Sequence, residues 1–265
     1  MRLPLELIMR ICDMLVEEYE IPTIQSCALL CSQLTGHCQS HLFANLNLYL
    51  DGSKESKVRR LNEILRVHPK LSDYIKAIYL SFLDSAYFDD PDLRSVLSRC
   101  MKVSTFELLS QERRNFGVLP DAATQVLEPI VRSPLLTKVI VSGFTVPLAT
   151  LFAHCRDSLT HLDYEAFGDE HIQVPSFIVA GAKTKFLRSL NARLPTVWCL
   201  LQFKREDGQV VFDLSQLREF ATENIANALD MQRLNTILHY AVRLERLSLR
   251  LYDGTLPDSN QAHLC

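Results

Sequence analysis

Glycine is scarce in this sequence, with only 8 among 265 residues. Globular proteins average about 7% glycine, so the chain has few of the residues on which tight β-hairpins depend. A hairpin-rich all-β fold is therefore disfavoured. The sequence also lacks the phosphate-binding patterns Gly-x-x-x-x-Gly-Lys and Gly-x-Gly-x-x-Gly, and the nucleophile elbow Gly-x-Ser-x-Gly. The commonest sequence signs of nucleotide binding and of serine hydrolysis are thus missing.

The sequence also lacks a dominant charge. Lysine and arginine number 28, aspartate and glutamate number 31, and the formal net charge is -3. A nucleic-acid-binding protein needs a concentrated basic face. We therefore expect no nucleic acid among the partners.

A third absence is a long apolar run. The longest uncharged stretch, Val139 to Cys155, contains Pro147 and is shorter than the ~20 residues of a typical membrane-spanning helix. The first residues include Glu6, Arg10 and Asp13, which interrupt any apolar core of a secretory signal. We expect no membrane partner and a cytoplasmic and/or nuclear location.

Apolar residues make up 48% of the chain and charged residues 22%, which are ordinary values for a core-forming protein. The eight cysteines are scattered through apolar contexts, and in a reducing compartment they behave as small hydrophobic side chains. The only cluster of metal-ligating residue types comprises Cys27, Cys31, His37, Cys38 and His41. Because the cysteines fall on apolar helix positions, we expect buried thiols, no bound metal and no cofactor.

The first fifty residues predict three short helices. Apolar residues recur at helical spacing in the first of them, at Leu3, Leu7, Ile8, Ile11 and Leu15. The second helix should begin near Pro22, and the third should end near Leu42. Helices this short cannot bury all their apolar faces against each other. The remaining apolar surface must contact the rest of the chain or a partner.

The order of these residues resembles an F-box, in particular the F-box-like modules that open many fungal F-box proteins. The matching segments are Leu3-Pro4-x-Glu6-Leu7-Ile8-x-x-Ile11-x-x-x-Leu15, Ser26-Cys27-Ala28-Leu29-Leu30-Cys31 and His41-Leu42-Phe43. The resemblance implies a three-helix module over residues 1–50 that binds the adaptor subunit of an SCF-type cullin–RING ubiquitin ligase. The adaptor-binding residues that it implies are Leu3, Pro4, Leu7, Ile8, Ile11, Leu15, Leu30 and Cys31. Where the family often has tryptophan, this chain has Leu34.

The same helices could instead form the N-terminal cap of a repeat protein, since a cap also needs one apolar and one polar face. Leu5, Met9, Cys12 and Met14 add apolar surface on further faces of the first helix. A helix that is apolar on several sides is buried on several sides. This breadth favours the F-box over the cap.

Beyond residue 50, one spacing recurs seven times: an apolar residue, two positions, a second apolar residue, one position, and a third position that is usually apolar. The repeats begin at Ile75, Val103, Leu136, Leu159, Leu187, Leu217 and Leu244. Their mean interval of about 28 residues lies within the ~20–29 range of leucine-rich repeats. We expect each repeat to form a short strand whose second and third apolar residues point to the same side.

Helices are expected between these strands. An amphipathic helix is predicted around Val58 to Leu65, and a last, longer helix over about Thr222 to Tyr240. Other helices should open with a proline in the first turn, at Pro91, Pro147, Pro175 and Pro195. Alternating strands and helices predict an α/β fold, an irregular leucine-rich-repeat-like solenoid with parallel strands over residues 51–265. No capping unit is evident after the seventh strand, as in a chain truncated at its C-terminus.

Together these features predict the substrate-recognition subunit of an SCF-type ubiquitin ligase. Its partners would be the adaptor subunit and an unknown protein substrate, and it would bind rather than catalyse, because other subunits of the ligase transfer ubiquitin. Residues between the buried apolar positions should face the concave side of the solenoid, where such folds usually bind. The candidate substrate-binding residues are His161, Asp163, Arg188, Asn191, Arg218, Glu219 and Arg246.

Two other functions stay open on the sequence alone. One is a leucine-rich-like interaction scaffold without a ligase role, whose first helices are only a cap. The other is a hydrolytic enzyme in an irregular α/β fold, since the repeat intervals are uneven and the usual asparagine ladder is missing. In such an enzyme, His161 and Asp163 share one face of a predicted strand and could act together.

Overall fold

The computed structural model describes residues 4–18, 20–30, 32–50, 57–82, 88–110, 121–144, 153–166, 177–225 and 227–251. These residues form an α/β structure around one sheet of eight strands. Every strand pairing in this sheet is parallel. The predicted α/β class with parallel strands is confirmed.

The strands of this sheet lie side by side in the order in which the chain forms them. They are β1 (Asn45–Leu50), β2 (Ala77–Phe82), β3 (Thr105–Ser110), β4 (Lys138–Phe144), β5 (His161–Ala166), β8 (Ser189–Ala192), β11 (Glu219–Ile225) and β12 (Arg246–Leu251). All seven strands predicted from the apolar repeat are present, as β2 to β5, β8, β11 and β12. The additional strand, β1, pairs with β2 along its whole length. Residues 45–50, which the sequence analysis grouped with the first helices, are therefore the first strand of the sheet.

The repeated apolar residues cover one side of the sheet. In β2 to β5 the second and third repeat positions are at most 2% exposed. The register places Ile78 beside Phe106 and Val139 beside Leu162, so each position forms a continuous row across the strands. The rows continue into β11, but in β12 the corresponding Leu247 and Leu249 are each 41% exposed. The core is therefore continuous from β1 to β11 and opens at β12.

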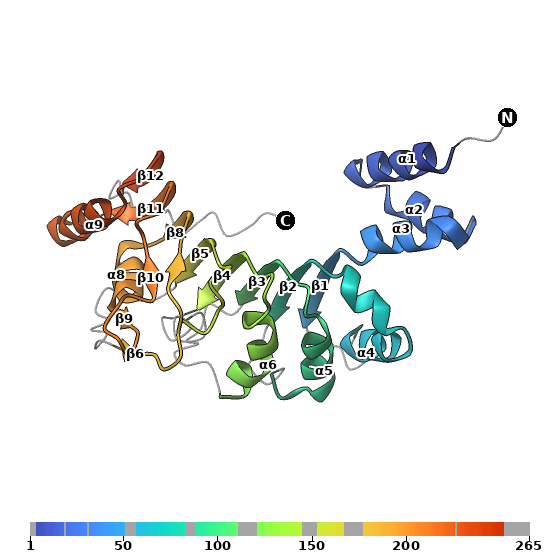
Figure 1. Cartoon of the computed structure of the whole chain (residues 1–265), viewed down its shortest axis with the longest axis horizontal. Coiled ribbons are helices and arrows are strands. Elements are labelled where there is room, and N and C mark those ends of the chain that lie inside the picture. Colours follow the sequence, from blue (N-terminus) through green and yellow to red (C-terminus); the bar gives the residue numbers. More distant parts are fainter. Residues whose placement is uncertain are drawn as a thin grey trace, which may run out of the picture.

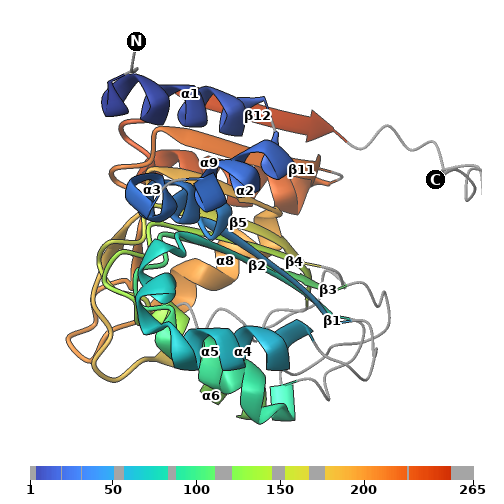
Figure 2. The same cartoon turned by 90° about the vertical axis from the view of Figure 1, so that its right-hand side faces the viewer.

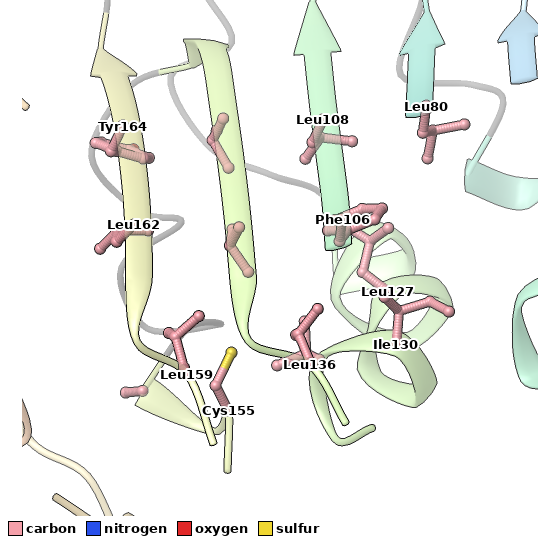
Figure 3. Close-up of a cluster of buried hydrophobic side chains, with 14 of the residues drawn as sticks. Leu80, Phe106, Leu108, Leu127, Ile130, Leu136, Cys155, Leu159, Leu162 and Tyr164 are labelled. Atoms are coloured by element: carbon pink, nitrogen blue, oxygen red, sulfur yellow. The ribbon is translucent and has the colours of Figure 1, made fainter. Parts of the chain in front are cut away.

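Helices cover the apolar side of the sheet. They are α4 (Lys57–Val67), α5 (Pro91–Arg99), α6 (Asp121–Val131), α8 (Leu194–Gln202) and α9 (Ala228–Tyr240), with a short 3₁₀ helix η1 (Pro69–Tyr74) after α4. Figures 1 and 2 show α4, α5 and α6 side by side along the outer, convex side of a curved sheet. Figure 3 shows how α6 contributes Leu127 and Ile130 to the same core as Phe106 of β3 and Leu162 of β5. None of the described helices lies over the middle of the concave side (Figure 1).

Two of the predicted proline starts are confirmed. Pro91 is the first residue of α5, and the side chain of Asp90 caps this helix by accepting hydrogen bonds from the backbone N–H groups of Asp92 and Leu93. Pro195 lies in the first turn of α8. The amphipathic helix around Val58 is also confirmed, as α4. Pro147 and Pro175 lie outside the described residues.

The predicted last helix is present as α9 and ends at Tyr240, but its predicted start near Thr222 was wrong. Residues up to Ile225 continue β11, and α9 begins only at Ala228, where the side chain of Asn227 accepts a hydrogen bond from the Asp230 N–H at 2.9 Å. The asparagine cap sets this boundary. Helix α6 was not predicted, because it lacks a first-turn proline and contains Pro129 in its interior.

A second set of hydrogen bonds joins the repeats one residue before each strand. The backbone N–H of Ser104 donates to the Lys76 carbonyl, that of Thr137 to Ser104, and that of Thr160 to Thr137; the series then passes through Arg188, Arg218 and Glu245. The hydroxyl groups of Ser104, Thr137 and Thr160 donate to these same carbonyls at 3.2–3.3 Å. This ladder fixes the start of each strand against the preceding one, in place of the missing asparagine ladder.

The three predicted N-terminal helices are confirmed as α1 (Leu5–Glu17), α2 (Ile21–Leu30) and α3 (Ser32–Leu42). They have a small core of their own, made by the buried side chains of Cys12, Ile24, Leu34 and Cys38. Leu34, the residue in the usual tryptophan position, is part of this core. The chain runs from α3 directly into β1, and α3 contacts η1, so the three helices lie at the β1 end of the sheet (Figure 1).

Two short strand pairs lie between β5 and β11. They are β7 (Lys185–Phe186) with β10 (Phe212–Asp213), and β6 (Phe177–Ile178) with β9 (Phe203–Lys204). Among the described helices, none is both long enough and apolar enough to cross a bilayer.

The burial difference between β5 and β12 predicts a difference in stability for one and the same substitution. Leu162→Ala removes a buried side chain and leaves a cavity, so we expect it to lower the free energy of unfolding by about 2–5 kcal/mol. Leu247→Ala, at the equivalent position of β12, should cost less than half as much, because Leu247 is already 41% exposed. Urea unfolding followed by circular dichroism would measure both. An equal decrease in the free energy of unfolding for the two variants would contradict a core that is closed at β5 and open at β12.

Candidate functional site

Helix α1 is apolar on two adjacent faces. One face carries Ile8, Cys12 and Leu15, which pack in the small core of the three helices. The other carries Leu7, Ile11 and Met14 at helical spacing, with exposed fractions of 48%, 47% and 55%. We call these three residues the α1 stripe. An exposed row of large apolar side chains on a helix is a common docking surface for a partner protein.

Of the adaptor-binding residues that the F-box resemblance implied, some are exposed and others pack in the core of the three helices. Leu7 and Ile11 lie in the α1 stripe, and Pro4 and Leu30 are also exposed. Ile8 and Leu15 instead pack against the module's own core. Met14 and Leu29 were not among the predicted binding residues, although both are more than half exposed. Leu3 and Cys31 lie outside the described residues.

A hollow of about 530 Å³ lies on the concave side of the sheet. Its polar lining comes from successive strands: Ser142 of β4, Asp163 of β5, Asn191 of β8, Arg193 after β8, Glu223 of β11, and Ser248 and Arg250 of β12. Ile140 and Ala221 contribute apolar surface between them. The volume falls within the ~300–1,000 Å³ of ligand pockets, but the lining residues come from a broad strip of the sheet.

Only two of the predicted substrate-binding residues line this hollow. They are Asp163 and Asn191, and the Asn191 side-chain amide donates a hydrogen bond of 3.0 Å to Asp163 Oδ1. The other five lie at or just before the starts of the strands: His161, Arg188, Arg218, Glu219 and Arg246. Arg188 lines a separate hollow of about 380 Å³ with Phe186 and Gln216 among its neighbours.

Charged residues on this side of the sheet pair across neighbouring strands. Arg246 lies 2.8 Å from Glu219, and Arg218 lies 3.6 Å from Glu245. These pairs are exposed, so each contributes little to stability.

Three charged lining residues, Arg193, Glu223 and Arg250, were not predicted from the sequence. Arg250 of β12 lies 3.3 Å from Glu223 Oε2, and Arg193 lies 3.9 Å from Glu223 Oε1, so one carboxylate lies between two guanidinium groups. Each of them lies one residue beyond the third position of the repeated spacing. Arg193 follows Ala192, Glu223 follows Thr222, and Arg250 follows Leu249.

Two backbone irregularities lie beside the hollow. The pairing of β4 with β5 shifts between Ser142 and Phe144, and Gly143 there has a φ of +89°. A Cβ atom at this position would lie 2.6 Å from the carbonyl oxygen of Ser110. Glycine is therefore required at this bulge, which ends the regular pairing beside Ser142. A similar shift occurs in β11 between Glu223 and Ile225.

Four of the described cysteines do not have the character of nucleophiles. Burial raises the pKa of Cys12, Cys100 and Cys155 to about 12 and that of Cys199 to about 11. A thiol with such a pKa stays protonated near neutral pH, whereas catalysis requires the thiolate. All six cysteines whose state is described, these four with Cys27 and Cys38, are free. Cys31 and Cys265 lie outside the described residues.

Lys185 is the most perturbed basic group described. Its side chain is fully buried, and burial lowers the pKa of its ammonium group to about 8. The Nζ atom donates hydrogen bonds to the carbonyl oxygens of Ala153 and Lys183. The residue lines neither of the hollows described above. We assign it a structural role, joining β7 to the segment before β5.

A scan against protein-family models finds no match for this sequence, and a search of curated proteins finds none either.

The buried Lys185 predicts a particular pH dependence of stability. Its pKa is about 8 in the folded protein, against an ordinary value of 10.5, so between these pH values the unfolded chain binds more protons. The contribution of Lys185 to the free energy of unfolding should therefore rise with pH from about 8 to about 10.5, by up to roughly 3 kcal/mol. Lys185→Met should lack this rise.

The measurement is urea unfolding of the wild type and of Lys185→Met at pH 7.5 and pH 10. The free energy of unfolding of the variant is subtracted from that of the wild type at each pH, because the buried thiols contribute equally to both proteins. Lys183→Met, at an exposed lysine two residues away, is the matched control and should follow the wild type. A wild-type-minus-variant difference that stays constant with pH would contradict the lowered pKa.

Proposed function

We propose that this protein is a substrate-recognition subunit of an SCF-type cullin–RING ubiquitin ligase. In this proposal α1–α3 form an F-box-like module that binds the adaptor subunit. The concave side of the sheet, a leucine-rich-repeat-like solenoid, binds a protein substrate. The observation that carries the proposal is the α1 stripe, a row of three large apolar side chains that are exposed. The other apolar face of the same helix already packs in the core of the three helices, so the stripe is available to a partner.

The position of the three helices supports two separate binding functions. They have their own core and lie at one end of the sheet, beyond β1 (Figure 1). The hollow on the concave side is lined by β3 to β12 and includes no residue of α1–α3. A partner bound at the α1 stripe would therefore leave the hollow available for a second protein.

The chemistry of the concave side suits a polar protein segment. Its residues include both carboxylates and guanidinium groups, arranged as pairs rather than as a field of one sign. Mixed charges of this kind provide specificity more than affinity. Arg250, whose side chain is 81% exposed in its pair with Glu223, is the most accessible of the residues around the hollow that carry a charge pair.

The proposed adaptor site predicts the effect of a double substitution. Leu7→Ala with Ile11→Ala removes two of the three α1-stripe side chains, and anchors of this kind typically cost ~2–4 kcal/mol each in binding. We expect adaptor binding, measured by calorimetry, to weaken by at least roughly a hundredfold. The far-ultraviolet circular dichroism should be unchanged, because both side chains are about half exposed.

Ile64→Ala with Val67→Ala is the matched control. Both residues are exposed apolar side chains on a helix, but they lie on α4 and not on the three N-terminal helices. This control should bind the adaptor as the wild type does. Undiminished adaptor binding by Leu7→Ala/Ile11→Ala, or no adaptor binding by the wild type, would remove the ligase proposal and leave an interaction scaffold.

The proposed substrate site predicts the effect of filling the hollow. Ala221 of β11 lines it and pairs with Asn191 on one side and Ser248 on the other. Ala221→Trp should occupy part of the hollow without changing a fully buried side chain. We expect the proteins that copurify with the wild type from its native cells to be depleted at least fivefold, as judged by quantitative mass spectrometry, while the adaptor is retained.

Ala228→Trp, at an exposed position in the first turn of α9, controls for the added tryptophan. If Ala221→Trp retains every partner, the substrate site lies elsewhere on the sheet. Arg188→Glu with Arg218→Glu then tests the row at the start of the strands.

A further inference from the structure

Three ligating side chains meet between α1 and α3. Nε2 of His37 lies 2.9 Å from Asp13 Oδ1, and Nε2 of His41 lies 2.7 Å from the same oxygen. The ligand atoms of all three residues lie within 4.8 Å of one another. Two histidines four residues apart share one face of a helix, and the packing of α1 on α3 brings the carboxylate to that face.

We propose that Asp13, His37 and His41 bind a divalent metal ion, with zinc as the best match. Imidazole nitrogen and carboxylate oxygen are ordinary zinc ligands, at about 2.0–2.2 Å from the ion. In a tetrahedral site two such ligand atoms are about 3.3 Å apart, somewhat more than the separations of 2.9 and 2.7 Å between the carboxylate oxygen and the two ring nitrogens. An ion could therefore enter with only a small outward movement of the three side chains.

The burial of the cluster also suits a metal site. The two histidine side chains are about one-quarter exposed, and that of Asp13 is 49% exposed. The histidines are thus held by the surrounding helices, while one side remains accessible for the ion to enter. Three protein ligands with water in the open position is a common zinc arrangement.

No metal was expected here from the sequence, because the histidines were considered together with cysteines that fall on apolar helix positions. In the structure, Cys38 points into the core and is fully buried, and Cys12 is buried beside it. The ligand that completes the set is Asp13, which lies 24 residues before His37 and belongs to another helix. The helical spacing of His37 and His41 was visible in the sequence, but the packing of α1 against α3 was not.

A bound ion would join α1 to α3 in a module whose own core, among its described residues, contains four buried side chains. Binding to the folded state alone stabilises it in proportion to the logarithm of ligand concentration over Kd. The ion would thus fix the position of α1, the helix that carries the α1 stripe. This site does not depend on what binds the stripe.

The test uses the full chain without a histidine tag, dialysed against a chelator and then titrated with zinc chloride by calorimetry. We expect one equivalent of zinc to bind with a micromolar or lower Kd, and the melting temperature to rise with zinc concentration. Asp13→Asn, His37→Ala and His41→Ala should each weaken binding at least tenfold. His239→Ala, at an exposed histidine on α9, should bind as the wild type does.

Cobalt substitution separates this site from a thiol site. Cobalt(II) bound by nitrogen and oxygen gives weak ligand-field bands without the strong thiolate-to-metal charge-transfer band that a cysteine ligand would produce. A charge-transfer band would overturn the proposal, as would equal zinc binding by the three variants. Absence of stoichiometric binding by the wild type would identify the cluster as a hydrogen-bonded pair of histidines on one carboxylate. If an alanine variant fails to fold, Asp13→Asn and His41→Gln provide the same comparison at nearly constant side-chain size.

Discussion

Side chains alternate across a β-strand, so a strand with one apolar row can bury only one of its two faces. Here every strand of the eight-stranded sheet from β2 to β11 buries its second and third repeat positions on the same side. Helices must therefore gather on that side. A helix with its side chains is about 10 Å wide, whereas neighbouring strands are about 4.8 Å apart, so covering helices take more room than the strands beneath them. The sheet curves away from the helices, and its polar face becomes the concave one.

The three N-terminal helices depend on a different balance. Their small core leaves the α1 stripe exposed and holds Asp13 against two histidines of α3. The apolar and the polar features lie on the same helix but on different faces of it. The placement of α1 therefore governs both the surface proposed for the adaptor and the cluster proposed for a metal ion.

The repeat could be predicted from the sequence because each unit is defined by the spacing of apolar residues within one short segment. Leu136, Val139 and Val141 define their strand without knowledge of any neighbour, and the strands β2 to β12 of the main sheet were found in this way. β1 was assigned to the first helices because His41-Leu42-Phe43 was grouped with them, although Phe43, Leu46 and Leu48 have the same apolar spacing as the other repeats. The end of β11 was misjudged because Asn227, and not the apolar pattern, sets the start of α9.

The hollow and the histidine cluster were less accessible to sequence reasoning. Arg193, Glu223 and Arg250 approach each other only through the register of three strands, and Asp13 meets His37 only through helix packing. The sequence supplied Asp163 and Asn191 correctly as residues of the open face. The other predicted residues lie at or just before the starts of the strands, outside the hollow.

The ladder of backbone hydrogen bonds from Lys76 to Glu245 links each repeat only to its immediate neighbours. Contacts of this kind make the array behave as a row of coupled units, in which opening spreads inward from an end rather than across the whole molecule at once. Among the described strands of the sheet, β12 loses the least buried apolar surface when it opens, because Leu247 and Leu249 are each 41% exposed. The side of the hollow that carries Arg250 is therefore the side that opens locally at the lowest cost in free energy. A ligand could thus be accommodated by local yielding at that rim while the opposite wall, on β4 and β5, stays rigid.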